Sequence, residues 1–547
     1  MKTNVCLCIV AALMVAACGD PSHRHNSGEK VSVINSEPDE VMEEEVEVTS
    51  NEAALMEPSA NATSKMILSS PPPPQQRNAE TYKEIKENSF VAVAQQPVTT
   101  FSADVDRAAY ANVRRIIGYG QIPPKDAVRI EEMVNYFDYD YPAPEEGSVS
   151  PLRVSPELAP APWNPNHLLL RIGLQAKKID LAKAPPSNIV FLIDVSGSMD
   201  EDNKLPLLKS SFKMLLGQLR PDDKIAIVTY ANGTKVALPS TSVKDKEKII
   251  KVLDNLYASG GTSGGKGIQL AYEQAQKSFI KNANNRIILA TDGDFNIGIN
   301  NTTDLEKFIE KQRESGIYMS VLGFGIGNYR DDMAETIADK GNGNYAYIDN
   351  ITEAKKVLVN ELSGTLFAVA KDVKLQLEFN PKYVKEYKLI GYENRMLANE
   401  DFTNDKKDAG EIGAGHTVTA LYELVPSDGK VAQSLRYQSQ ELNEKGKGNE
   451  LGFLKIRYKD PKVKDAKSVE ITEPLVFNKK ALKETSTDYR FAASVAEFGI
   501  LLRDNSNKAK ATYDQVIELA EGAIGKDPEG YRKEFVRLVK SVKMLPK

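Results

Sequence analysis

Residues 189–199 read Ile-Val-Phe-Leu-Ile-Asp-Val-Ser-Gly-Ser-Met. An apolar run rich in β-branched residues that ends abruptly in small polar residues is typical of a buried parallel strand. Apolar residues then recur with helical spacing between Lys204 and Leu219. We therefore expect Asp194, Ser196 and Ser198 to lie on a strand-to-helix loop at the carboxyl edge of an α/β sheet, where open α/β sheets bind their ligands.

The side chains of this loop offer one carboxylate and two hydroxyl groups. Oxygen ligands of this kind suit Mg²⁺ or Mn²⁺. Because the hydroxyls are neutral, the loop cancels little of an ion's charge, and an open position on the ion would invite a carboxylate from a partner. The same residues also fit an ordinary turn with capping serines, since Ser and Asp are favoured at helix N-termini. The Asp-x-Ser-x-Ser pattern alone leaves both interpretations open.

Two further stretches favour the metal site. Residues 256–262 read Leu-Tyr-Ala-Ser-Gly-Gly-Thr, which places a hydroxyl on a glycine-rich loop. Residues 286–294 read Arg-Ile-Ile-Leu-Ala-Thr-Asp-Gly-Asp, a second apolar strand that ends in a carboxylate. Together, Asp-x-Ser-x-Ser, Gly-Gly-Thr and Thr-Asp-Gly resemble the metal-ion-dependent adhesion site of von Willebrand factor type A domains, and the resemblance covers roughly residues 187–364.

This resemblance implies a metal shell and a kind of partner. The implied cofactor is Mg²⁺ or Mn²⁺, and the implied partner is a protein that offers an exposed carboxylate. The shell would consist of Asp194, Ser196, Ser198, Thr262 and Asp292, with Asp292 usually acting through water. Asp294 is an extra carboxylate that we interpret as a solvated turn residue. Residues 260–266 also fit the phosphate-binding pattern Gly-x₄-Gly-Lys, but Gly267 stands where that motif needs Ser or Thr.

The first 18 residues are a targeting segment. Lys2 precedes an apolar run that is too short to span a bilayer, which is typical of a cleaved signal. The end of this run, Val-Ala-Ala before Cys18, resembles a bacterial lipoprotein signal and implies cleavage before Cys18 and lipidation of its thiol. Plain secretion with an incidental cysteine is the alternative. We expect a lipid-anchored protein on a bacterial membrane, periplasmic or surface-exposed, with the outer membrane as the expected location.

Cysteine, charge and histidine usage exclude several classes of protein. Of 3 cysteines, only Cys18 would remain after cleavage, so no internal disulfide forms. The net charge is −6, and residues 19–58 alone carry 11 acidic against 2 basic residues. Nothing offers a basic footprint for nucleic acid. None of the 4 histidines lies between residues 187 and 366, so a catalytic Ser-His-Asp set has no local base. We therefore expect that this protein is not an enzyme and that it does not bind nucleic acid.

The chain divides into seven expected segments. The fold class is α/β: a doubly wound, mostly parallel sheet, similar to von Willebrand factor A and Rossmann-like folds, flanked by a mixed β-sandwich and a helical region. Trp163 is expected to anchor a surface seam between domains. The segments are a lipoprotein signal (1–18), a disordered acidic and Pro-rich tether (19–82), an N-terminal helical module (83–165) that resembles one found in a group of bacterial lipoproteins, a strand that would join the C-terminal β region (166–186), the A domain (187–366), an antiparallel β region (367–480) and C-terminal helices (481–547).

These observations predict a membrane-anchored lipoprotein that binds a protein partner through a divalent metal. The alternative function is a structural or assembly factor of the cell envelope, in which the metal only stabilises the fold. Metal removal distinguishes the two functions. It releases the partner if the metal mediates binding, and it only lowers the melting temperature if the metal stabilises the fold.

Overall fold

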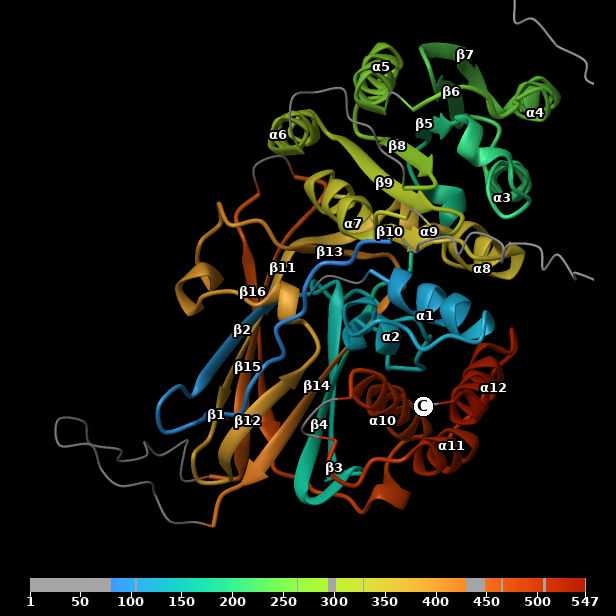
Figure 1. Ribbon diagram of the computed structural model, residues 1–547. Coiled ribbons are helices and arrows are strands. Elements are labelled where there is room, and N and C mark those ends of the chain that lie inside the picture. Colours follow the sequence, from blue (N-terminus) through green and yellow to red (C-terminus); the bar gives the residue numbers. More distant parts are fainter. Residues whose placement is uncertain are drawn as a thin grey trace, which may run out of the picture. The chain divides into compact units, whose positions relative to one another are not determined.

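The apolar run at 189–193 forms the middle of β5 (Ser187–Asp194), a strand whose residues are all buried. In the described part of the chain β5 lies in a six-stranded sheet of order β10-β9-β8-β5-β6-β7 (Figure 1). All neighbours pair in parallel except β6 and the edge strand β7. The other strands are β6 (Lys224–Tyr230), β7 (Thr234–Ser242), β8 (Asn284–Thr291), β9 (Ile317–Gly323) and β10 (Tyr345–Tyr347). The predicted doubly wound, mostly parallel α/β fold is confirmed.

The structure is a computed structural model. It describes residues 80–103, 106–262, 264–293, 302–327, 329–428, 448–463, 466–504 and 508–546. These residues belong to one compact unit, Pro74–Lys547. The expected signal, Cys18, almost all of the expected tether and Asp294 lie outside the described residues.

Helices cover both faces of the parallel sheet. Val190 and Leu192 of β5 belong to one apolar core, and Ile189, Phe191 and Ile193 belong to the other, as the period-two geometry of a strand requires. The first core is closed by α5 (Gly264–Lys277), α6 (Thr302–Arg313) and α7 (Asp331–Lys340). The second is closed by α3 (Leu205–Gln218), α4 (Lys246–Asp254) and the helical segment after β10. We call residues 187–366 the α/β domain.

The helical segment that closes the α/β domain is interrupted by a wider turn. It consists of α8 (Ile351–Lys355), a π-helical turn η5 (Lys356–Asn360) and α9 (Leu362–Leu366). Within the turn the Glu361 amide donates to the Lys356 carbonyl at 3.0 Å, and the side chains of these two residues form a buried ion pair. The widened turn therefore brings a buried ion pair into a segment whose apolar spacing predicts a regular helix.

Two antiparallel sheets form a β-sandwich beside the α/β domain. In the described residues one sheet has the order β1-β12-β14-β4-β3, and the other has the order β13-β11-β15-β16, with β2 also paired to β11. β4 pairs with β14 from Leu168 to Gln175, so the strand before the α/β domain lies in a sheet with strands that follow it. The strands are β1 (Val91–Ala92), β2 (Val98–Ser102), β3 (Leu152–Ala161), β4 (Asn164–Ala176), β11 (Ala368–Phe379), β12 (Val384–Ile390), β13 (Gly410–Gly413), β14 (Thr417–Pro426), β15 (Glu450–Lys459) and β16 (Val469–Val476).

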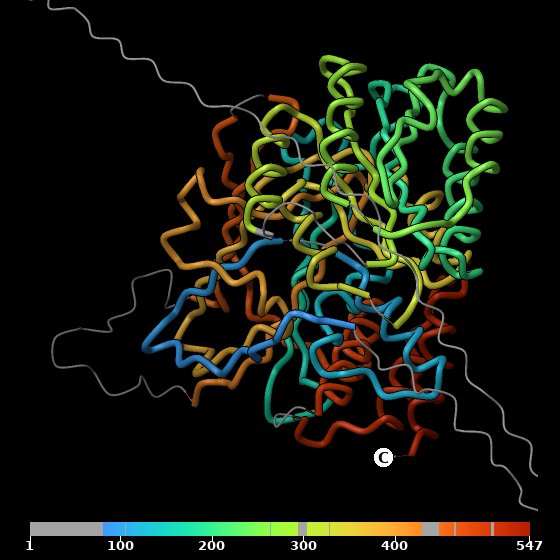
Figure 2. Tube along the Cα trace, turned by 45° about the horizontal axis from the view of Figure 1, so that its top comes forward, coloured from blue at the N-terminus to red at the C-terminus, as the bar shows by residue number. Residues whose placement is uncertain are grey.

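The segment 83–165, expected to be helical, is mixed. It contributes β2 and β3 to the sandwich and two helices, α1 (Ala108–Gly118) and α2 (Ile130–Asn135). α1 and α2 share a hydrophobic core with the C-terminal helices α10 (Thr487–Leu502), α11 (Tyr513–Glu521) and α12 (Tyr531–Met544). In Figures 1 and 2 these blue and red helices lie side by side although they come from opposite ends of the chain.

Two of the C-terminal helices, α11 and α12, are separated by a turn in which Gly525 and Gly530 adopt positive φ angles. The expectation for Trp163 was wrong: the residue is fully buried rather than a surface anchor, and its indole Nε1 donates to Glu423 Oε2 at 2.9 Å. Among the described helices, none is both long and apolar enough to cross a membrane.

Candidate metal site at the carboxyl end of the parallel sheet

Two carboxylates meet at the carboxyl edge of the parallel sheet. Asp194 is the last residue of β5, and Asp292 directly follows β8. β5 and β8 are parallel neighbours paired as far as Ile193 and Ala290, so both strands deliver an aspartate to the same edge. Both side chains are completely shielded from solvent.

The serines of the Asp-x-Ser-x-Ser pattern fold back on Asp194. The Ser196 amide donates to Asp194 Oδ1 at 2.9 Å, and Ser196 Oγ lies 3.0 Å from Ser198 Oγ. Ser196 is buried and Ser198 is half-buried at the short helix η3 (Gly197–Asp200). The loop therefore gathers one carboxylate and two hydroxyls in direct contact, which is the local arrangement that the sequence pattern predicts.

The glycine-rich loop that carries Thr262 is bonded to this loop. The Gly197 amide donates to the Gly260 carbonyl at 2.8 Å, and the Ser259 amide donates to the Val195 carbonyl at 2.8 Å. Gly260 has a φ of +76°, and a Cβ there would lie 2.4 Å from Asn232 Nδ2. Thr262 itself is half-buried two residues further on. A side chain at Gly260 would therefore collide with Asn232 in the turn between β6 and β7, and a Cβ at Gly197 would lie 3.3 Å from the Gly260 carbonyl oxygen, so glycine at these two positions permits the close packing of the loops.

Two hydroxyl groups beside Asp194 were not predicted from the sequence. Thr291 Oγ1 lies 3.5 Å from Asp194 Oδ2, and the hydroxyl of Tyr230, at the end of β6, is close enough to the same carboxyl group to lower its pKa. Burial, together with the charge of Asp292, raises the pKa of Asp194 to about 7, although the hydrogen bonds from Ser196 lower it. The apolar run that ends in Tyr230 was the available signal, because its end falls at the same sheet edge.

Lys204 is a third residue that sequence reasoning missed. It stands immediately before α3, and its side chain is 3% exposed. Its ammonium lies 3.3 Å from Asp292 Oδ2 and 2.9 Å from the Ser198 carbonyl oxygen. A lysine at a helix N-terminus opposes the helix dipole, which favours acidic residues there. This conflict was the signal that could have marked Lys204 as bound to something outside its helix.

The donor set fits a hard divalent cation. Among the described residues no three His, Cys, Asp or Glu side chains gather into a metal-binding group, so this edge offers two carboxylates and several hydroxyls in place of a carboxylate cage. Hydroxyl and carboxylate oxygens are ligands that Mg²⁺ and Mn²⁺ accept, with water filling the remaining positions. The ammonium of Lys204, 3.3 Å from Asp292 Oδ2, already balances one of these two carboxylates.

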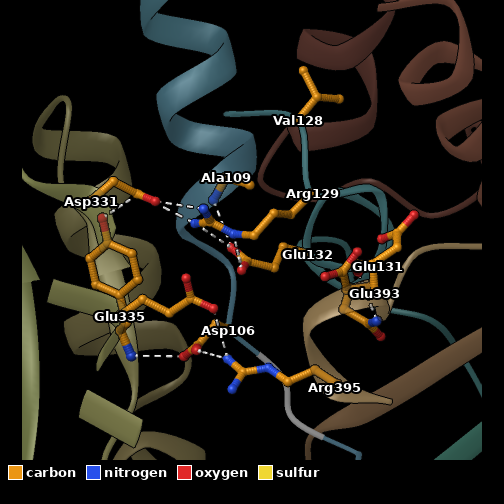
Figure 3. Close-up of polar contacts among 12 residues, drawn as sticks. Asp106, Ala109, Val128, Arg129, Glu131, Glu132, Asp331, Glu335, Glu393 and Arg395 are labelled. Carbon is orange, nitrogen blue, oxygen red and sulfur yellow. Dashed lines mark hydrogen bonds and ion pairs between the residues drawn. The ribbon is translucent and has the colours of Figure 1, made fainter. Parts of the chain in front are cut away.

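A second group of charged residues lies where the α/β domain meets the N-terminal helices and the sandwich (Figure 3). Arg129, which precedes α2, pairs with both Glu132 and Asp331 of α7. Arg395 pairs with Asp106 and with Glu335, again on α7. These side chains are almost wholly buried except Arg395, which is 14% exposed. The group is a network of buried ion pairs that fixes α7, and we assign it a structural role.

Comparisons with known proteins agree with this fold. The model of the von Willebrand factor type A domain matches residues 188–360, a model described as von Willebrand factor matches residues 76–171, and a model of the C-terminal region of the uncharacterized protein YfbK matches residues 364–545. The uncharacterized protein YfbK of Escherichia coli (strain K12) is 48% identical over 465 residues, which are 84% of this chain and 80% of that protein.

Two further proteins are similar to this chain at lower sequence identity. The uncharacterized protein sll0103 of Synechocystis is 26% identical over 60% of this chain and 74% of its own length. A solved von Willebrand factor type A protein from Catenulispora acidiphila has a TM-score of 0.40 at 15% identity, and covers 71% of this chain and 88% of its own. On the strength of the Escherichia coli relative and the domain match, this chain belongs to the YfbK family of von Willebrand factor type A domain proteins.

Proposed function

We propose that this chain is a membrane-anchored, non-enzymatic binding protein that holds a protein partner through a divalent metal. Asp194, Ser196, Ser198 and Thr262 would hold Mg²⁺ or Mn²⁺, with Asp292 acting through water. When bound, the ion supplies a positive charge with an open coordination position. The partner offers an exposed carboxylate to that position.

The observation that carries this proposal is the meeting of Asp194, Ser196, Ser198 and Asp292 at one sheet edge. Two buried aspartates that lie close together repel each other, and a divalent cation between them would remove that cost. Von Willebrand factor type A domains typically mediate protein–protein interaction. The first consideration favours a bound cation, and the second favours a binding function. The described residues of the α/β domain include no histidine that would serve as a base.

The metal is tested by calorimetric titration of Mg²⁺ and of Mn²⁺ into the full chain and into Asp194→Ala. We expect saturable binding by the unchanged chain and none by the variant. Asp200→Ala is the matched control, because Asp200 is an exposed carboxylate on η3, the same loop. Equal binding by all three proteins would contradict the site. Binding that Asp200→Ala loses as fully as Asp194→Ala would also contradict it.

The partner is tested by cross-linked capture from the cell envelope. We expect a captured protein that is released by a chelator and is absent with Asp194→Ala. If the chelator lowers the melting temperature but leaves the captured protein in place, the metal only stabilises the fold, and the envelope assembly function is favoured instead.

The membrane anchor rests on the sequence before residue 19. Labelling of growing cells with a palmitate analogue should mark the chain, and Cys18→Ser should abolish the label and release the protein from the membrane fraction. A variant at Cys6, inside the part expected to be cleaved, is the control. Label retained in Cys18→Ser would overturn the assignment of this cysteine.

A further inference from the structure

Lys204 places a fixed positive charge beside the proposed metal site. Its ammonium lies 3.3 Å from Asp292 Oδ2, and the two side chains are 3% and 0% exposed. It also donates to the Ser198 carbonyl oxygen at 2.9 Å and lies 3.4 Å from Glu201, which is mostly exposed. An ammonium buried this deeply is stable only when it is paired and hydrogen-bonded, so its position beside Asp292 is a specified part of the fold.

The backbone of the neighbouring loop is shaped to admit this lysine. Gly325, after β9, has a φ of +81°, and a Cβ there would lie 2.3 Å from Cε of Lys204 and 2.9 Å from its Cδ and Cγ. The Gly325 carbonyl accepts a bond from the Tyr347 hydroxyl, which holds this loop in place. The lysine stem is therefore confined along its length, and its ammonium has little freedom to leave Asp292.

The charges at this sheet edge then determine what the site binds. With Asp194 and Asp292 ionised, Lys204 leaves the edge with one net negative charge. A divalent cation would convert this to one net positive charge. Without the lysine the loaded site would be neutral, because two carboxylates balance one divalent ion. Exposed Glu201 is screened by water and changes this balance little.

We propose that Lys204 sets the ligand preference of the site: it weakens metal binding, and it gives the metal-loaded site a surplus positive charge that selects a carboxylate over a neutral group. This inference rests on the proposed function. Charges buried at such short distances interact far more strongly than charges on the surface, because little water separates them. Lys204 is thus a specificity-determining residue and not a metal ligand.

The test uses the full chain with Mn²⁺ as the metal and acetate and acetamide as probes. Mn²⁺ affinity is measured by calorimetry, and water-proton relaxation of bound Mn²⁺ reports when a probe displaces a coordinated water. In Lys204→Met we expect Mn²⁺ to bind at least about tenfold more tightly and acetate at least about tenfold more weakly, so that acetate loses most of its advantage over acetamide. Lys266→Met is the matched control, since Lys266 is an exposed lysine in the first turn of α5.

Lys204→Gln is made in parallel, because glutamine keeps a donor for the Ser198 carbonyl while removing the charge. The same shifts in this variant support the proposal even if Lys204→Met folds poorly. Unchanged or weaker Mn²⁺ binding by a folded Lys204 variant overturns it. Absence of Mn²⁺ binding by the unchanged chain would instead overturn the proposed function, and this inference with it. The two failures are therefore distinguishable.

Discussion

The guanidinium of Arg129 holds both carboxylate oxygens of Asp331: Nη1 lies 2.5 Å from Oδ2, and Nη2 lies 3.3 Å from Oδ1. Arg129 precedes α2 in the N-terminal segment, and Asp331 begins α7 of the α/β domain (Figure 3). Tyr345 of β10 donates to the same carboxylate at 2.7 Å. One buried arginine of the N-terminal segment thus ties the start of α2 to α7 of the α/β domain.

Removal of Arg129 should lower the free energy of unfolding substantially. Arg129→Met leaves Asp331 and Glu132 buried without their cation, and breaking a buried ion pair on one side costs about 3–5 kcal/mol. We expect urea unfolding to show a loss of this size in the free energy of unfolding. Lys355→Met is the control: its pair with Glu529 is about half exposed, and such pairs contribute about 0–1 kcal/mol. Equal losses in the two variants would contradict a structural role for the buried network.

The carboxyl of Glu131 makes stability depend on pH. Burial and the nearby charge of Glu393 together raise the pKa of Glu131 to about 7, although the charge of Arg503 lowers it. Arg503 is itself committed to Glu393, with Nη1 2.5 Å from Oε1. Because the folded chain keeps the Glu131 proton that the unfolded chain releases near pH 4.5, stability should fall as the pH rises from about 4.5 to 7 and then level off.

Glu131→Gln isolates this effect. The variant should be more stable than the unchanged chain by on the order of 1–3 kcal/mol at pH 8, and the difference should shrink towards zero near pH 4.5. Denaturant unfolding at several pH values measures it. A difference that is constant over this range, or that grows on acidification, would show that Glu131 does not titrate in this window.

The sequence predicted those features that arise from neighbouring residues. The alternation of apolar strands with helically spaced segments predicted the α/β fold, and the aspartates at the end of β5 and directly after β8 predicted two carboxylates at one sheet edge. Parallel strands that end in polar residues bring those residues together whatever lies elsewhere in the chain. The contact of Ser196 with Asp194 is equally local. Metal binding by these residues stays a prediction.

Features that arise from distant residues were not predicted. β2 pairs with β11, more than 250 residues away, and nothing in its own five residues indicates that partner. Lysine is usually a surface residue, and only the fold places the ammonium of Lys204 against Asp292. The expectation for Trp163 failed for the same reason: its sequence neighbours are mostly prolines and asparagines, but Glu423 of β14 and the helical core enclose it.

The bond from Trp163 to Glu423 gives a further prediction. Trp163→Phe removes the indole donor and leaves one oxygen of a buried carboxylate without it, which costs about 1–3 kcal/mol. Tyr119→Phe is the matched control, because Tyr119 is 61% exposed and its hydroxyl is free to bond to water. We expect a clear drop in the unfolding midpoint for the first variant and almost none for the second. Similar midpoints would contradict the importance of this bond.

The metal site itself predicts two effects of opposite sign in one variant. Asp194 has its pKa raised to about 7 by burial, so its ionised form destabilises the metal-free fold at pH 8. Asp194→Asn can still accept from the Ser196 amide and should be more stable than the unchanged chain in a chelator, by on the order of 1–3 kcal/mol. In Mg²⁺ at 100 times its dissociation constant, the unchanged chain should gain about 2.7 kcal/mol and the variant nothing. Denaturant unfolding at pH 8 with and without Mg²⁺ measures both effects. If the variant is less stable than the unchanged chain both with and without Mg²⁺, Asp194 is needed for the fold itself. If the variant is more stable without Mg²⁺ and less stable with it, the buried carboxylate lowers the stability of the metal-free fold and is needed for metal binding.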